Sequence, residues 1–161
     1  MSSRRGQLGM IGALALGVTM LAGCGGTHEV TKSEYGTELR AATSGLDGVS
    51  GDISRATAPS KLTTQQRIAQ IRSIQLGLRE SGNELADVTP PADLRDEHEQ
   101  LVSGVRDMAD AVDLLIRAEQ LSERDPARAT ALLRRFATDP SLARVQEATT
   151  RIAKAGVDAG I

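Results

Sequence analysis

The stretch LRDEHEQLVSGVRDMADAVDLL, residues 94–115, decides the fold class. Its apolar residues and one histidine recur at alternating intervals of four and three, a spacing that places them on one face of a helix. No segment of the chain shows the sustained two-residue alternation of a half-buried strand. The stretch therefore predicts a long amphipathic helix, from about Pro90 to Ser122, within an all-α protein. The buried face of this helix is predicted to consist of Leu94, His98, Leu101, Val105, Met108, Val112 and Leu115.

A similar seam precedes this helix, near the start of the helical region. It steps by four and three from Tyr35 to Ala56, so we expect one helix that ends at Ala58-Pro59-Ser60. Four glycines lie within it, and each weakens a helix by up to ~1 kcal/mol relative to alanine. This helix is therefore predicted to be the least stable one. Its seam residues are Tyr35, Leu39, Ala42, Leu46, Val49, Ile53 and Ala56.

A second helix is predicted between this seam and the long helix. Thr63 or Thr64 can cap its N-terminus, and Val88-Thr89-Pro90-Pro91 ends it. We expect Thr89 to cap the long helix and Pro90 to be its first residue, where the missing N–H costs nothing. The apolar face of the second helix is predicted to contain Ile68, Ile71, Ile74, Leu78 and Leu85.

The C-terminal region carries the same combination of a capping residue and a proline twice, at Asp125-Pro126 and Asp139-Pro140. Residues 126–156 therefore form either two helices or one helix kinked at Pro140. Their apolar positions are predicted to face the same core as the other helices. We expect an antiparallel bundle of four or five helices joined by short connections. These positions are Ala129, Leu132, Leu133, Phe136, Leu142, Val145, Thr149 and Ile152.

The N-terminus has the pattern of an export signal. Arg4 and Arg5 precede an apolar run, Leu8 to Ala22, of about 15 residues. A helix that spans a bilayer needs about 20 residues, so we expect a signal peptide that is removed. Ser3-Arg4-Arg5-Gly6-Gln7-Leu8 is similar to a twin-arginine motif, although two ordinary basic residues of a signal are the alternative.

Leu21-Ala22-Gly23-Cys24 resembles the lipobox of bacterial lipoproteins, in which a leucine and two small residues precede a cysteine. The resemblance implies that the Cys24 sulfur receives a diacylglyceryl group and that a peptidase cuts before Cys24. The alternative is a free thiol, because the chain has no second cysteine for a disulfide. We predict a signal peptide over residues 1–23, a tether over 24–31 and a bundle over 32–161. The lipid on Cys24 would anchor this lipoprotein to the outer face of the cytoplasmic membrane.

Charge and aromatic content exclude several classes of partner. Without residues 1–23, 138 residues would remain, enough for one compact domain, with a net charge of −4. This negative charge argues against nucleic acid as a partner. Tyr35 and Phe136 are the only aromatic residues, which argues against ligands that stack on rings, such as sugars or single-stranded nucleic acid.

His98 is the one candidate in the bundle for catalytic chemistry or metal binding. Arg95 stands three residues before His98, where a di-iron bundle has glutamate, and the motifs for haem attachment and a nucleophile elbow are absent. We therefore expect no enzyme, no cofactor and no metal. His98 is predicted to be a buried histidine bonded to a neighbouring group. The alternative is a ligand or pH-sensing site formed with Glu97 and Glu99, whose charges would raise the pKa of His98.

Two sets of charged residues complete the sequence. They predict solvated faces with some pairing between helices or a docking surface for an envelope protein. We expect a lipid-anchored interaction domain at the cell envelope. The alternative function is binding of a lipid or another apolar ligand between helices whose core has almost no aromatic rings. The acidic set is Asp93, Asp96, Asp107 and Asp110, and the basic set is Arg124, Arg128, Arg134, Arg135, Arg144 and Arg151.

Overall fold

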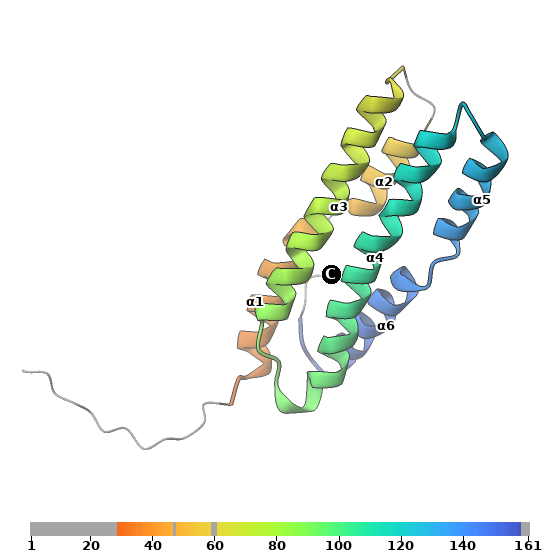
Figure 1. Cartoon of the computed structure of the whole chain (residues 1–161). Coiled ribbons are helices and arrows are strands. Elements are labelled where there is room, and N and C mark those ends of the chain that lie inside the picture. Colours follow the sequence, from red (N-terminus) through yellow and green to blue (C-terminus); the bar gives the residue numbers. More distant parts are fainter. Residues whose placement is uncertain (1–28, 47, 59–60, 159–161) are drawn as a thin grey trace, which may run out of the picture.

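The computed structural model describes residues 29–46, 48–58 and 61–158, and all regular elements in these ranges are helical. They form four rods that pack side by side and alternate in direction (Figure 1). The predicted all-α antiparallel bundle is thus confirmed, with four rods and not five. The first rod contains α1 (Lys32–Thr43), a 3₁₀ turn η1 (Ser44–Leu46) and α2 (Val49–Thr57). The others are α3 (Thr64–Asp87), α4 (Arg95–Leu121, after the 3₁₀ turn η2, Ala92–Leu94), and α5 (Pro126–Ala137) with α6 (Ser141–Lys154).

Side-chain caps explain where three of these helices begin. The hydroxyl of Thr31 accepts from the Glu34 backbone N–H, and the Glu34 carboxylate accepts from the Thr31 N–H. Thr63 and Gln66 form the same reciprocal pair at α3, as predicted for Thr63. At α5, Asp125 caps the helix as predicted. Each cap satisfies backbone donors that have no partner within the helix.

The predicted start of the long helix is wrong. Thr89 does not cap it, and α4 begins only at Arg95, after η2. The reason is the pair of prolines, because the ring of Pro91 disfavours the helical conformation of Pro90. Pro91 itself has an extended backbone, with ψ near 152°. The chain therefore turns once more before it can enter α4.

The predicted first helix is also wrong, because it is broken in two. Gly48, immediately before α2, has φ near 82°, in the left-handed region that favours glycine. The break separates α1 from α2, so the two halves of the seam no longer lie on one continuous face. At the other end of the chain, residues 126–156 form two helices. The carboxylate of Asp139 accepts from the Ser141 N–H over 2.9 Å, but Pro140 is the N-cap of α6, so Asp139 is not the cap that the sequence predicted.

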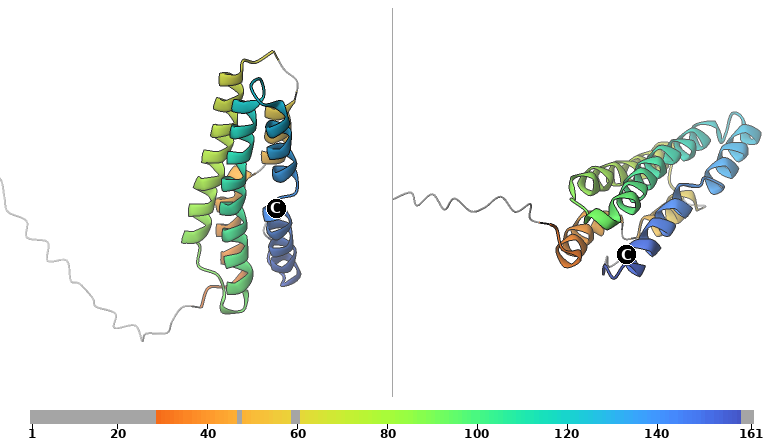
Figure 2. Two further views of the ribbon diagram at one scale, coloured as in Figure 1. Left: turned by 45° about the vertical axis from the view of Figure 1, so that its right-hand side comes forward. Right: turned by 90° about the horizontal axis from the view of Figure 1, so that it is seen from below.

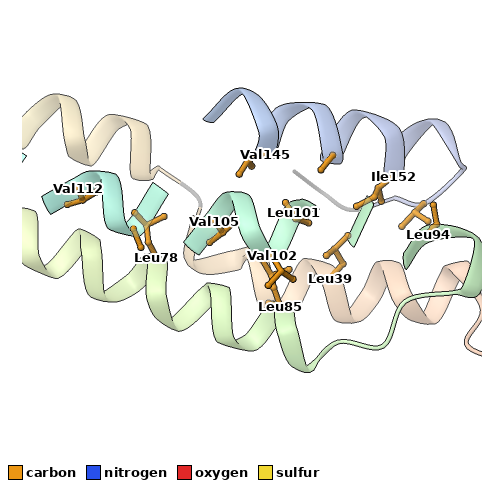
Figure 3. Packing of buried hydrophobic residues seen from close by; sticks show 14 of the residues in the cluster. Leu39, Leu78, Leu85, Leu94, Leu101, Val102, Val105, Val112, Val145 and Ile152 are labelled. Atoms are coloured by element: carbon orange, nitrogen blue, oxygen red, sulfur yellow. The ribbon is translucent and has the colours of Figure 1, made fainter. Parts of the chain in front are cut away.

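Helix α4 forms the centre of the bundle and packs against α3, α5 and α6. Figure 3 shows side chains of α3, α4 and α6 that converge around Leu101 and Val105. Val105 and Val112 are fully buried as predicted, whereas Met108 is only half-buried. The contact between α4 and α6 is close at Gly104, where an added Cβ would lie 2.8 Å from Val145 Cγ2.

Polar ties reinforce the pairing of α3 with α4. The buried Gln75 side chain donates from Nε2 to the Ala109 carbonyl over 2.9 Å and to the Asp113 carboxylate over 3.0 Å. Arg67 and Glu119 form a partly buried ion pair at 2.8 Å. Within the described ranges, no helix has the length and apolar character needed to cross a membrane.

Candidate functional site

An apolar groove of about 1,030 Å³ lies between the first and fourth rods. One wall consists of Val49 and Ile53 of α2, from the C-terminal half of the predicted seam. The opposite wall is Leu142 and Val145 of α6, and Met108 of α4 contributes to the lining between them. Figure 2 shows α5 and α6 as one interrupted rod beside α4. Leu46, Phe136 and Ala153 extend the apolar lining.

The groove is open because α2 packs against α3 and not against α6. Among the described residues, no hydrogen bond or ion pair joins α2 to α6. Tyr35 and Leu39 of the seam are fully buried, but Val49 and Ile53 are only half-buried. The prediction that the whole seam lies in the core is therefore wrong at Val49 and Ile53, whereas Ala56, the last residue of the seam, is buried as predicted. Leu142, also predicted to face the core, is 51% exposed at the groove.

Opposite charges stand at the two ends of the groove. Asp139 lines one end, between α5 and α6. Burial alone would raise the pKa of Asp139, but hydrogen bonds from Ser141 and the nearby Arg144 and Arg135 guanidinium groups hold it below its usual value. Lys154 lines the other end, is exposed, and forms no ion pair with the described residues. The groove is thus mostly apolar with hydroxyl and amide side chains among its lining, and it has Asp139 at one end and Lys154 at the other.

His98 lies elsewhere, at the contact between α1 and α4. It is 5% exposed, and its Nδ1 lies 3.0 Å from the hydroxyl of the fully buried Tyr35. The two rings meet edge to face, with centroids 5.7 Å apart. A backbone hydrogen bond to Leu85 of α3 engages the ring as well. This is the buried, bonded histidine that the sequence predicted, and it joins three helices.

The pKa of His98 moves in the opposite direction from the one expected for a histidine between two acids. Burial lowers this pKa, and the effect outweighs the Leu85 hydrogen bond and the charge of Glu99, which both raise it. Burial, together with the charge of Glu97, raises the pKa of Tyr35 to about 12. His98 is therefore neutral at pH 7, so Nδ1 can accept the hydrogen bond from the Tyr35 hydroxyl.

The structure brings His98 and Glu99 to one shallow hollow of about 590 Å³, whereas Glu97 does not line it. Arg95 and Arg106 line the same hollow. The Nδ1 atom of His98 already has a partner in the Tyr35 hydroxyl. No three His, Cys, Asp or Glu side chains gather into a metal-binding group in the ranges that the structure describes. The geometry at His98 is that of a structural hydrogen bond between helices.

Many of the charged residues predicted to form a docking surface are paired. Asp107 of α4 pairs with Arg144 of α6 at 2.8 Å, and Asp93 pairs with Lys32 of α1 at 2.9 Å. Asp110 lies 3.5 Å from Arg79 of α3. These are half-exposed pairs between helices, of the kind that contributes only ~0–1 kcal/mol to stability.

The sequence reasoning missed the groove, although it identified most of the residues that line it. It assigned Val49, Ile53 and Leu142 to the core because their helical spacing is that of core residues. The signal that distinguishes them is the run of glycines at 45, 48 and 51, which interrupts the seam where the groove begins. Cys24, the predicted lipidation site, lies outside the described residues, as does the predicted signal peptide.

Comparison with protein-family models, with curated proteins and with solved structures finds no match for this chain.

Proposed function

We propose that this chain is a lipid-anchored protein of the cell envelope whose helical domain binds an apolar ligand in the groove between α2 and α6. The anchor is the lipid on Cys24 that the lipobox implies. The observation that carries the binding function is the groove itself. Its volume of about 1,030 Å³ lies at the upper end of ligand sites, which range over about 300–1,000 Å³ and are mostly apolar.

The groove favours binding of an apolar ligand over the other expected function, docking of an envelope protein on a charged surface. Val49, Ile53 and Leu142 offer apolar surface to the groove, and covering such surface is favourable by about 25 cal/mol per Å². Three residues of the acidic set, by contrast, are already paired with basic residues of neighbouring helices, Asp93 of η2 and Asp107 and Asp110 of α4. A chain with few aromatic rings is also suited to a flexible aliphatic ligand rather than a flat one.

The anchor is tested by changing Cys24 to serine in the full chain and separating membranes from soluble fractions. Two or three acyl chains attach a protein stably, whereas one is marginal. We expect the variant to leave the membrane fraction or to accumulate as an uncleaved precursor. A mature protein that stays in the membrane without acyl mass on its N-terminus would refute the anchor.

The groove is tested in cells that incorporate a photoreactive fatty acid into their lipids. After illumination, we expect lipid adducts on the groove walls, mapped by mass spectrometry of the purified full chain. Gln146→Trp, at an exposed position that lines the groove, should reduce adduct yield severalfold. Gln70→Trp, exposed on α3 and outside the groove, is the matched control and should not reduce it. Equal yields from both variants, or no adduct in the groove, would refute ligand binding there.

A further inference from the structure

We infer that the occupant of the groove is the acyl chain of an anionic phospholipid, inserted with its head group at Lys154 and its methyl end toward Asp139. This inference rests on the proposed function and specifies the ligand, its head group and its direction.

The length of the groove suits an acyl chain. On α6 the apolar lining residues run from Leu142 to Ala153, which at 1.5 Å per residue is a span of roughly 17 Å. A staggered hydrocarbon chain with C–C bonds of about 1.5 Å advances about 1.25 Å per carbon. Roughly 14 carbons therefore fit along the groove, a length in the range of membrane acyl chains.

The cation at the Lys154 end favours one direction for the lipid. Lys154 is exposed and has no ionic partner in the part of the chain that the structure describes, so it is available to a phosphate. Asp139 stays ionised because hydrogen bonds from Ser141 hold its carboxylate. An anionic head group is attracted to Lys154, whereas at the other end the nearby Arg135 and Arg144 offset the charge of Asp139.

The Lys154 end is also the end from which the anchor extends. The Lys32 ammonium group donates to the Ala155 carbonyl over 3.1 Å, so the start of α1 lies against the end of α6. Eight residue steps separate Lys32 from Cys24, and an extended chain covers at most about 3.6 Å per residue. The tether therefore holds this end within roughly 29 Å of the lipidated residue. A phospholipid can enter from the same membrane while its head group stays near the bilayer surface.

The test uses the full chain, purified from membranes and reconstituted into phosphatidylcholine vesicles. The vesicles carry a small fraction of a photoreactive probe lipid, either phosphatidylglycerol or phosphatidylcholine, with the reactive group at the methyl end or near the carbonyl of one chain. Trypsin cleaves after Arg135, Arg144 and Arg151, which separates the two ends of α6 into different peptides. Methyl-end probes should label residues 136–144, and carbonyl-end probes should label residues 145–154.

Phosphatidylglycerol should label the groove more than phosphatidylcholine, by about two- to fivefold, the preference expected from one exposed charge pair. Lys154→Gln should abolish this preference. Lys61→Gln removes the same charge from an exposed position outside the groove and should retain it. Equal labelling by the two head groups, or the reversed position of the adducts, would overturn the inference while ligand binding in the groove stands. No groove labelling by any probe would overturn both the inference and ligand binding in the groove. The exception is an adduct, formed in cells, that joins the groove to the peptide with Cys24. That adduct would identify the protein's own anchor as the occupant and would overturn the inference alone.

Discussion

Helices α3 and α4 pack along their lengths, whereas α2 and α6 face each other across a groove, although both pairs present apolar side chains at helical spacing. Between α3 and α4, Leu78 and Val105 are fully buried and Gln75 donates two hydrogen bonds across the contact. Between α2 and α6, Ile53 is half-buried and Leu142 is half-exposed. The same apolar pattern thus forms a core in one pair and the walls of a groove in the other.

The difference between the two pairs arises from the length of the uninterrupted helices and not from the hydrophobicity of their side chains. Helices α3 and α4 have 24 and 27 residues, long enough to contact each other over many turns. Helix α2 has nine residues and follows a glycine in the left-handed conformation. Its position is therefore set by its contact with α3. Short helices depend on tertiary packing for their stability, and α2 has packed on one side only.

The strongest test of this comparison removes a side chain from the α3–α4 core. Leu78→Ala should destabilise the protein by about 2–5 kcal/mol, because it deletes a fully buried side chain and leaves a cavity. The free energy of unfolding is measured by urea denaturation. A loss below about 1 kcal/mol would mean that α3 and α4 do not form the core.

A second substitution tests the close contact between α4 and α6. Gly104→Ala would place a Cβ 2.8 Å from Val145 Cγ2 and 3.3 Å from the Val145 backbone nitrogen. We expect a loss of about 1–2 kcal/mol in unfolding free energy, since overpacking exceeds the gain in helix propensity. Gly77→Ala is the control, because a Cβ there meets nothing within 4 Å. Gly77→Ala should stabilise the protein by about 0.5–1 kcal/mol. A change in unfolding free energy in the same direction for both variants would contradict the assigned contact.

The tie at His98 predicts a smaller, pH-dependent effect. Its pKa in the folded protein lies below the ordinary 6.5, so between these two values the unfolded chain binds more protons than the folded one. Stability is therefore full above about pH 6.5 and falls as the pH decreases through this window. Urea denaturation at about pH 7.5 and 5.5 should show the decrease for the unmodified protein. His98→Gln should show a weaker decrease, and an identical one would place the titrating group elsewhere.

The smallest effect is expected on the groove wall. Leu142→Ser removes an apolar side chain that is already 51% exposed, so the free energy of unfolding should change by no more than about 0.5 kcal/mol. A loss comparable to that of Leu78→Ala would show that Leu142 belongs to the core in solution.

Much of this fold was predictable from the sequence, because helical spacing and caps act locally. The buried face of α4, except for Met108, and a cap of α3 at Thr63 or Thr64 followed from residue types and intervals alone. The start of α4 required the mutual effect of Pro90 and Pro91, and the break before α2 required the conformation of Gly48. The glycines at 45, 48 and 51 mark where the seam is interrupted, but helical spacing did not predict the groove, because it shows which side chains share a face and not which face remains without a partner.

The central claim is that Ile53 is a ligand contact and not a core residue. We would measure lipid adduct yield, in cells with photoreactive lipids, for the full chain carrying Ile53→Asn. Ile74→Asn is the matched control, since Ile74 is also half-buried but does not line the groove. Adduct yield per folded molecule should fall severalfold for Ile53→Asn and stay unchanged for Ile74→Asn. An unchanged yield for Ile53→Asn, or an equal fall for both variants, would contradict the claim.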